Sequence, residues 1–218
     1  MTSQTESHRY YTNHRENQRE RILEVAEKLF LRDGIDSITL AQIAIAARLT
    51  RVTLYQYFPD KKEIAWAVFK KVIDELQAAM VGELAQTNGS GYDKIKRILL
   101  ATINSLETQT DSLRFIALFN FLYAREGSPM RMRGILEQAA LTGKKGSTAD
   151  FIREGIADGS LRPDLDADLT AASISNLLAG MTSRFALLGT NVEQEFGYKN
   201  SDLFHEIVVN FLRGIRAS

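Results

Sequence analysis

Cysteine is absent from the 218 residues, so the sequence offers no disulfide, no thiolate nucleophile and no thiolate metal ligand. This absence fits a reducing cytoplasm, where disulfides are rare. Proline is scarce, and no apolar run approaches the roughly 18 residues that a membrane span needs. The N-terminal segment is too charged for a signal peptide. We therefore expect a cytoplasmic protein with a sizeable core, since 44% of its residues are apolar.

A basic excess, the usual mark of a nucleic-acid binder, is also missing, because 27 Lys and Arg residues balance 27 Asp and Glu residues. The charges are nevertheless unevenly distributed. Residues 1–62 hold ten cationic and eight acidic side chains, and from Thr39 to Lys62 four cations stand against Asp60 alone. Phosphate affinity would therefore rely on local placement and on two copies of the site.

The stretch from Thr39 to Ile64, TLAQIAIAARLTRVTLYQYFPDKKEI, predicts two short helices. Thr39 and Gln42 form a capping box at the start of the first helix, and Thr50 can cap the second. Two such helices with a tight connection make a helix-turn-helix, whose second helix lies in the major groove of DNA. The second helix carries cationic, hydroxyl, amide and phenol groups, which suit contacts with bases and phosphates.

The sequence TLAQIA, followed by LTRVTLYQYF, Lys61 and Glu63-Ile64, resembles the DNA-binding signature of the TetR family of bacterial repressors. This resemblance implies an all-helical architecture over nearly the whole chain. Two positions depart from the family pattern, because Arg48 in the turn and Val52 in the second helix stand where the family usually has glycine. Glycine in such a turn commonly supports φ > 0, which is costly for a long side chain. Val52 presents methyl groups that suit contact with a thymine methyl.

The predicted DNA contacts come from the helix starts, the turn, the second helix and the start of the following helix. They are Thr39, Arg48, Thr50, Arg51, Val52, Thr53, Tyr55, Gln56, Tyr57 and Lys61. Lys61 is expected to contact a phosphate rather than a base. Arg15 and Arg19, near the start of the preceding helix, either face a phosphate or belong to a solvated charged surface.

Apolar periodicity near 3.6 residues predicts an all-α fold of about nine or ten helices in two domains. Residues 1–62 are expected to form the helix-turn-helix domain of three helices, after a disordered arm at residues 1–12. The resemblance implies that residues 63–218 form a helical ligand-binding and dimerisation domain. The expected helices outside the motif are 14–33, 61–86, 92–109, 112–126, 129–141, 148–158, 166–188 and 201–216. A polar loop separates the last two, and whether 142–147 breaks a helix stays open.

The helix expected at 61–86 has apolar residues on two faces, as does a helix that is packed on both sides. It would then link the DNA-binding and regulatory parts; the alternative is a helix buried in one core. Aromatic residues nearby are either plain core or, in a chain that resembles small-molecule sensors, the lining of a ligand pocket. The pocket set is Trp66, Phe69, Ile73, Phe115, Phe119, Tyr123 and Met181.

The resemblance also implies that the two C-terminal helices pair with their mates across a two-fold axis. The predicted dimer contacts are Gly180, Met181, Arg184, Phe204, Val208 and Phe211. The predicted function is thus a homodimeric, DNA-binding transcriptional repressor that a small-molecule effector releases from a palindromic operator, with no cofactor. The alternative is a helical protein-binding module that has lost DNA binding. An enzyme is not expected, because His8, His14 and His205 are not spaced as a metal site or catalytic triad requires.

Overall fold

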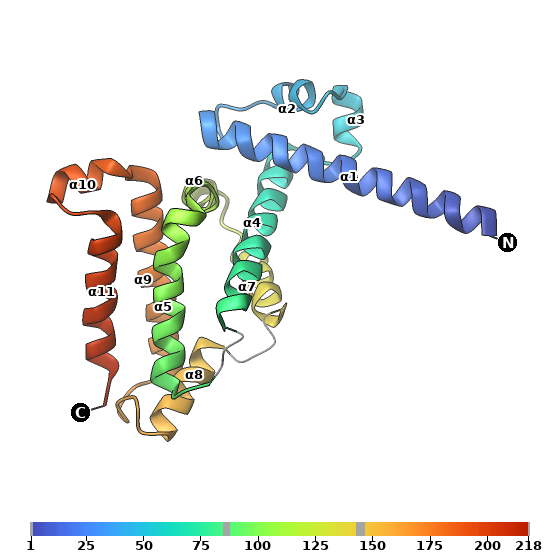
Figure 1. Cartoon of the computed structure of the whole chain (residues 1–218). Helices are drawn as coiled ribbons and strands as arrows, with labels where there is room; N and C mark the ends of the chain where they lie inside the picture. The colour runs from blue at the N-terminus through green and yellow to red at the C-terminus, as the bar shows by residue number, and fades with distance from the viewer. Residues whose placement is uncertain (1, 85–87, 143–146, 218) are drawn as a thin grey trace. The chain divides into compact units, whose positions relative to one another are not determined.

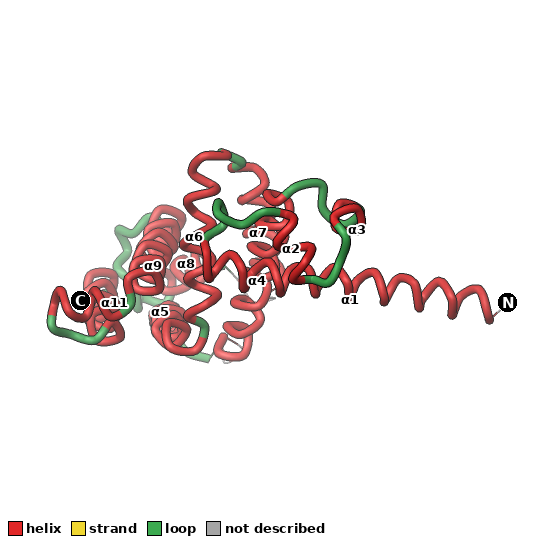
Figure 2. Tube along the Cα trace, turned by 90° about the horizontal axis from the view of Figure 1, so that it is seen from above, coloured by secondary structure: helices red, strands yellow, loops and turns green. Residues whose placement is uncertain are grey.

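The computed structural model describes the backbone of residues 2–84, 88–142 and 147–217; within these ranges it leaves the side chains of 2–13, 80–84, 126 and 137–142 undescribed. Eleven helices and no strand occur in the described ranges, so the expected all-α class is confirmed (Figures 1 and 2). The helices are α1 (Thr2–Asp33), α2 (Leu40–Ala46), α3 (Arg51–Tyr55), α4 (Lys61–Leu84), α5 (Gly91–Thr108), α6 (Thr110–Glu126), α7 (Pro129–Thr142), α8 (Thr148–Ala157), α9 (Ala167–Leu188), α10 (Thr190–Phe196) and α11 (Asn200–Ile215). None of these helices is both long and apolar enough to cross a membrane.

The first helix is longer than expected. α1 begins at Thr2, so the backbone of residues 2–12 is helical where the sequence predicted a disordered arm. Residues 2–33 contain neither proline nor glycine, so no residue in them interrupts the helical hydrogen bonds. The expectation relied on polar composition, which indicates a segment with little to bury but does not exclude a helix.

The short helix α10 lies where a polar loop was expected. It has seven residues, buries Val192 and ends at Gly197, whose φ is 73°. A helix of this length shows too little apolar repetition to be recognised in the sequence. The question of residues 142–147 falls mostly outside the described residues: α7 ends at Thr142, and Ser147 caps α8.

The chain forms two compact units, the first from residues 1–72 and 118–126 and the second from residues 73–117 and 127–218. Both α4 and α6 run from one unit into the other. This division differs from the boundary expected after residue 62, because the first half of α4 and the last part of α6 cluster with the N-terminal helices. Local composition gives no sign of such a boundary, since it falls inside two continuous helices.

The core of the first unit is built by α1, α2, α3 and the beginning of α4. Its fully buried residues include Phe30 of α1 and Ile43 of α2. Ile64 of α4, from one of its two predicted apolar faces, is also fully buried. Lys71 of α4 forms an ion pair with Glu27 of α1, with Nζ and Oε2 2.8 Å apart. This ion pair links α4 to α1, the helix that precedes the helix-turn-helix.

Four aromatic residues of the predicted ligand pocket pack together within the first unit. The rings of Phe69 and Phe119 stack with their centroids 4.4 Å apart. Trp66 meets Phe119 edge-on at 4.9 Å and Tyr123 at 6.2 Å. Trp66 and Phe119 are only 4% and 0% exposed, so these rings pack as core residues do. The remaining predicted pocket residues, Ile73, Phe115 and Met181, belong to the second unit.

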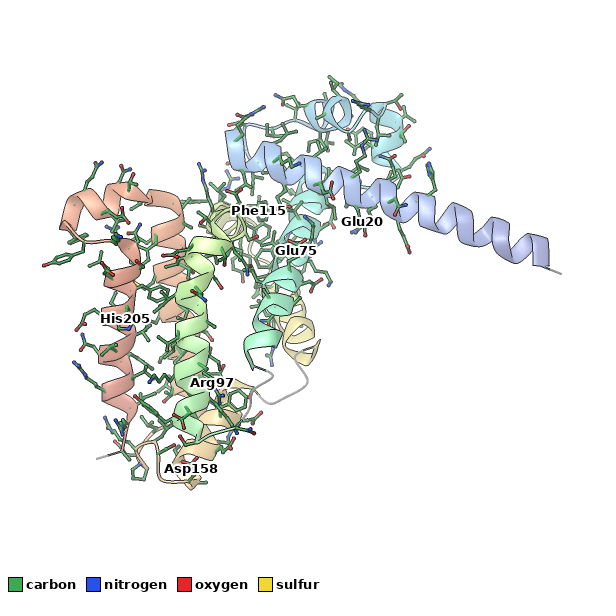
Figure 3. All side chains as sticks on the ribbon, viewed as in Figure 1. Glu20, Glu75, Arg97, Phe115, Asp158 and His205 are labelled. Carbon is green, nitrogen blue, oxygen red and sulfur yellow. The ribbon has the colours of Figure 1, made fainter. Side chains whose placement is uncertain are left out.

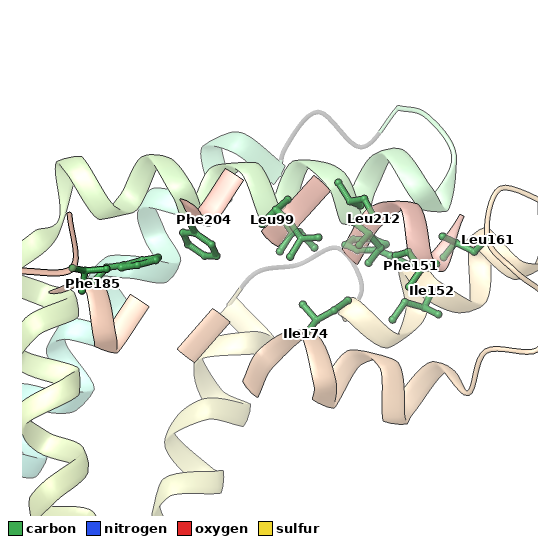
Figure 4. Packing of buried hydrophobic residues seen from close by; sticks show 13 residues of the cluster. Leu99, Phe151, Ile152, Leu161, Ile174, Phe185, Phe204 and Leu212 are labelled. Atoms are coloured by element: carbon green, nitrogen blue, oxygen red, sulfur yellow. The ribbon is translucent and has the colours of Figure 1, made fainter. Parts of the chain in front are cut away.

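The core of the second unit lies among α5, α8, α9 and α11 (Figure 4). Leu99 of α5, Ile152 of α8 and Ile174 of α9 meet there at 2% exposure or less. The ring centroids of Phe185 and Phe204, from α9 and α11, are 5.9 Å apart. The C-terminus closes this unit, because Arg216 forms an isolated bridge with Leu161.

Two of the predicted dimer contacts, Phe204 and Val208, do not lie on the surface of the chain. Phe204 and Val208 are both 0% exposed, buried in the core of their own unit with Leu212 and Ile215 of the same helix. These residues form the single buried stripe of α11. The sequence showed that α11 has more apolar positions than one face holds, but not which of them face the chain's own core. Gly180 and Arg184 are exposed, and Met181 and Phe211 are half-buried.

Candidate nucleic-acid interface

The first helix of the predicted motif begins with the capping box that its sequence predicts. Gln42 N donates to Thr39 Oγ1 at 3.3 Å, and Thr39 N donates to Gln42 Oε1 at 2.8 Å. Ile43 and Ala44 anchor the helix in the core at 0% and 1% exposure. The Thr39 hydroxyl also contacts Gln42 Oε1 at 2.7 Å, so its main role within the protein is to fix the start of α2.

The turn after α2 places Arg48 in the left-handed region, with φ of 55°. Among the described residues, Arg48 is the only non-glycine residue with a positive φ. Arg48 N donates to Ile45 O at 3.0 Å, and Leu49 N donates to Ala44 O at 2.8 Å. These two bonds form a Schellman motif, in which the left-handed position is usually glycine. The sequence indicated only that a positive φ here would be costly for arginine; the structure shows that Arg48 adopts it. The exposed guanidinium of Arg48 projects from a strained backbone.

The second helix, α3, is short and well anchored. Thr50 caps it by accepting from Thr53 N at 3.1 Å, and the hydroxyls of Thr50 and Thr53 lie 2.9 Å apart. Leu54 and Phe58 are 1% and 4% exposed, so they hold the helix on the core. The guanidinium of Arg19 lies 5.2 Å from the centre of the Phe58 ring, a cation–π contact that joins α1 to the end of the motif.

The exposed side chains of the motif form a surface that we call the recognition surface: Arg48, Thr50, Arg51, Val52, Tyr55 and Gln56. Val52 is 72% exposed and Tyr55 is 55% exposed, which is unusual for residues of their size. The surface combines two guanidinium groups with a hydroxyl, an amide, a phenol and the isopropyl group of Val52. These are groups that contact phosphates, base edges and thymine methyls. Of the other predicted contacts, Thr39 is exposed, and Thr53, Tyr57 and Lys61 are half-buried.

Lys61 has a partner within the protein. Its Nζ donates to the backbone oxygen of Asp36 at 2.8 Å. Burial lowers the pKa of Lys61, whereas the charge of Asp36 raises it and that of Arg125 lowers it. An ammonium group has three N–H donors, so Lys61 still has donors for a phosphate while it holds Asp36.

The predicted DNA contacts leave out Ile45 of α2, an apolar side chain of the motif that is 76% exposed. Its signal was that it falls outside the apolar stripe of α2, formed by the buried Ile43, Ala44 and Ala47. Sequence reasoning also missed Asp36 and Arg125, whose side chains meet at 2.7 Å. No sequence signal pairs these two residues, because they lie on different elements 89 positions apart.

Residues 22–68 match the family model described as bacterial regulatory proteins, tetR family. The match runs from α1 through α2 and α3 into α4, the elements that build and support the recognition surface. The chain has the DNA-binding domain of the TetR family. It is therefore a DNA-binding transcriptional regulator, and the alternative of a protein-binding module finds no support. TetR-family regulators bind DNA and typically act as dimers.

Relatives with this kind of domain match the chain well beyond the motif. The HTH-type transcriptional repressor KstR2 of Mycolicibacterium smegmatis is 24% identical over 163 residues, which cover 70% of this chain and 72% of the relative. The HTH-type transcriptional regulator TtgR of Pseudomonas putida is 24% identical over 175 residues, covering 80% and 83%. The structure of the ketosteroid transcriptional regulator KstR2 of Mycobacterium tuberculosis has a TM-score of 0.64 at 21% identity, covering 92% of this chain and 95% of that one.

A cavity of about 270 Å³ opens in the second unit. Parts of α5, α9, α10 and α11 line it, including the side chains of Glu107, Phe185 and Glu193. None of the seven predicted pocket residues lines this cavity. The effector pocket at the aromatic residues therefore stays a prediction.

Proposed function

We propose that this TetR-family regulator is a homodimeric repressor that binds a palindromic operator and leaves it when a small-molecule effector binds. The observation that carries the proposal is the exposure of Val52 and Tyr55 beside Arg51 on a helix whose opposite face is anchored by Leu54. Exposed large side chains on a rigid, capped helix are suited to a partner surface, and the cations among them suit DNA.

The recognition surface supports a division of labour on DNA. Arg51, Tyr55 and Gln56 lie on or at the end of α3, where they can reach base edges and the adjacent backbone. Arg48 and Lys61 flank the helix, and we assign both to phosphates. Val52 is assigned to a thymine methyl, because its methyl groups are exposed and it lacks a polar atom in its side chain.

The proposed dimer uses the exposed face of α9 in place of the buried residues of α11. Leu169 and Leu187 are 66% and 36% exposed, and both lie on the same face as Gly180 because the helix repeats every 3.6 residues. A Cβ on Gly180 would meet no atom within 4 Å, so this position is open to a second helix. In such a dimer the two recognition surfaces must be about 34 Å apart, one turn of DNA, to occupy both half-sites.

Effector release requires that the effector bind the DNA-incompetent state more tightly than the competent one. A coupling of about 1–3 kcal/mol would lower operator affinity roughly 5- to 150-fold. Both α4 and α6 continue from the second unit into the DNA-binding unit, so a change in the second unit has a continuous path to the motif. Trp66, on α4 within the aromatic cluster, is placed to report such a change.

The experiment is a gel shift of the purified chain with the DNA that flanks its own gene. The proposal expects a sequence-specific shift that competitor DNA without the palindrome does not abolish. Compounds that release this DNA should change the emission of Trp66, the single tryptophan, over the same concentration range. Release of DNA with unchanged Trp66 emission would show that the surroundings of Trp66 on α4 do not respond to the effector. Absence of any sequence-specific shift would refute the proposal that the chain is a repressor.

A further inference from the structure

The turn between α1 and α2, residues 34–38, determines where α2 begins. Gly34 ends α1 with φ of 81°, and its N–H donates to Phe30 O at 2.9 Å. Ile35 and Ile38 are buried at 5% and 1% exposure, and Thr39 then caps α2. Since α3 follows α2 through the tight turn at Arg48, a displacement of residues 34–38 would displace the recognition surface as well.

Two helices hold the exposed residue in the middle of this turn, Asp36. Lys61, the first residue of α4, donates from Nζ to the backbone oxygen of Asp36 at 2.8 Å. Arg125, near the end of α6, donates from Nη2 to Asp36 Oδ1 at 2.7 Å. All three residues belong to the first unit, to which α6 contributes residues 118–126.

The two contacts on Asp36 differ in their chemistry. The Lys61 contact needs only the main chain at position 36, whereas the Arg125 contact needs the carboxylate. Lys61 and Arg125 lie within electrostatic reach of each other, because the charge of Arg125 contributes to lowering the pKa of Lys61. The carboxylate of Asp36 therefore offsets a repulsion between two cations. Its removal leaves that repulsion in place, whereas removal of the Arg125 charge abolishes it.

Apolar packing supports the turn only partly on the side of α6. A cavity of about 180 Å³ opens between residues 34–37 and the face of α6 formed by Leu118, Phe121 and Leu122. Phe121 is 66% exposed, so its ring does not fill the gap. Because the apolar packing between the turn and α6 is incomplete, the ion pair between Arg125 and Asp36 is a direct link between them.

We propose that Arg125 is a positioning residue for DNA binding: its ion pair with Asp36 fixes the turn that starts α2 and so keeps the recognition surface in place. This inference rests on the proposed DNA-binding function and deepens it. Because α6 continues from the second unit, it provides a route beside α4 by which the state of that unit affects operator affinity.

The test compares Arg125→Gln with Arg114→Gln, which removes an exposed arginine from the part of α6 in the second unit. Amide hydrogen exchange is measured across α2 in the free protein. Affinity is measured on a duplex that the wild-type chain selects from random-sequence DNA. We expect Arg125→Gln alone to speed exchange in α2 and to weaken duplex binding about 2- to 5-fold, the range for an exposed ion pair.

Three further results distinguish positioning from a direct DNA contact. The salt dependence of binding should be unchanged in Arg125→Gln, because a residue that touches no phosphate releases no counterion. Arg125→Lys should restore affinity, since it keeps the charge. Asp36→Asn should weaken binding at least as much as Arg125→Gln, and adding Arg125→Gln to it should weaken binding no further, because the repulsion is then gone.

Amide hydrogen exchange in α2 that is as slow in Arg125→Gln as in the wild type would overturn the proposal. A slope of log affinity against log salt concentration that is reduced by about 1 in this variant would also overturn it, because it indicates a phosphate contact. Faster exchange in α2 together with failure of the wild-type chain to select any duplex would support the positioning of α2 and refute the DNA-binding function. The two failures are therefore distinguishable.

Discussion

Gly91 at the start of α5 crosses Gly155 of α8 so closely that a Cβ on Gly91 would lie 2.2 Å from the Gly155 nitrogen. At the same place Gly91 N donates to the carboxylate of Asp158 at 2.8 Å, and the Asp158 side chain lies beside the start of α5 (Figure 3). The crossing joins two of the helices that form the core of the second unit. No side chain fits at position 91 unless the two backbones move apart.

We therefore expect Gly91→Ala to destabilise the protein by about 1–3 kcal/mol, the usual cost of overpacking. Gly134→Ala is the matched control, because Gly134 lies in helix α7 with no atom within 4 Å of its added Cβ. This change should stabilise by about 0.4–1 kcal/mol, since it restricts the unfolded chain. Urea unfolding monitored by circular dichroism measures both. A Gly91→Ala protein as stable as wild type would contradict the close crossing.

Asp158 makes the stability of this crossing depend on pH. Hydrogen bonds from the Ser160 side chain and the Gly91 backbone N–H lower the pKa of Asp158. With a lower pKa in the folded than in the unfolded state, the unfolded chain binds more protons, so stability increases with pH. The contribution is complete above the ordinary carboxyl value of about 3.9 and is lost as pH falls through the folded pKa.

Asp158→Asn should therefore lower the melting temperature at neutral pH and lose this deficit in acid, below the folded pKa. Asp164→Asn is the comparison, because the pKa of Asp164 is also lowered but its partner, Arg162, lies only two residues away. Such a local pair should matter less to the crossing of α5 and α8. A deficit for Asp158→Asn that persists undiminished at low pH would show that the carboxylate charge is not its origin.

The left-handed Arg48 gives a prediction that separates strain from charge. Arg48→Gly should stabilise the first unit by about 1 kcal/mol, because glycine adopts φ of 55° without the steric cost. Arg48→Ala should bring no such gain, since it keeps the Cβ. Both variants should weaken DNA binding and reduce the salt slope by about 1 if Arg48 contacts a phosphate. Equal thermal stability of the glycine and alanine variants would argue against strain at this turn.

Much of the motif could be predicted from the sequence, because its determinants are local. Thr39 and Gln42 lie three residues apart, and Thr50 caps the second helix by accepting from Thr53 N, also three residues away. Apart from α10, the helices of the second unit were predictable to within one or two residues for the same reason. Their faces were not: apolar spacing showed that Val208 faces something apolar, but not whether this is its own core or a second copy.

The support of the motif could not be predicted, because it depends on contacts between distant residues. Arg125 and Asp36 meet only once residues 118–126 of α6 have packed with the N-terminal helices in the first unit, and neither residue belongs to a recognisable pattern. Ile45 illustrates the opposite case: its position outside the apolar stripe of α2 was visible, but the predicted DNA contacts included no residue from the middle of α2.

The corrected dimer surface gives a pair of contrasting variants. Val208→Asp should unfold the second unit, since an unpaired charge in this core costs about 3–5 kcal/mol. Gly180→Glu should leave the fold intact, because the position is open, and should separate the dimer by blocking the approach of a second α9. Circular dichroism and analytical ultracentrifugation read the two effects. A folded Gly180→Glu dimer would place the interface elsewhere.

DNA binding by the recognition surface is tested most directly by fluorescence anisotropy on the selected duplex. Arg51→Ala and Tyr55→Ala remove exposed side chains of this surface, and Lys96→Ala removes an exposed cation of α5 in the second unit. We expect the first two to weaken binding by about 1–3 kcal/mol with unchanged melting temperatures, and the third to bind as the wild type does. Wild-type affinity in both Arg51→Ala and Tyr55→Ala would show that this surface does not bind DNA.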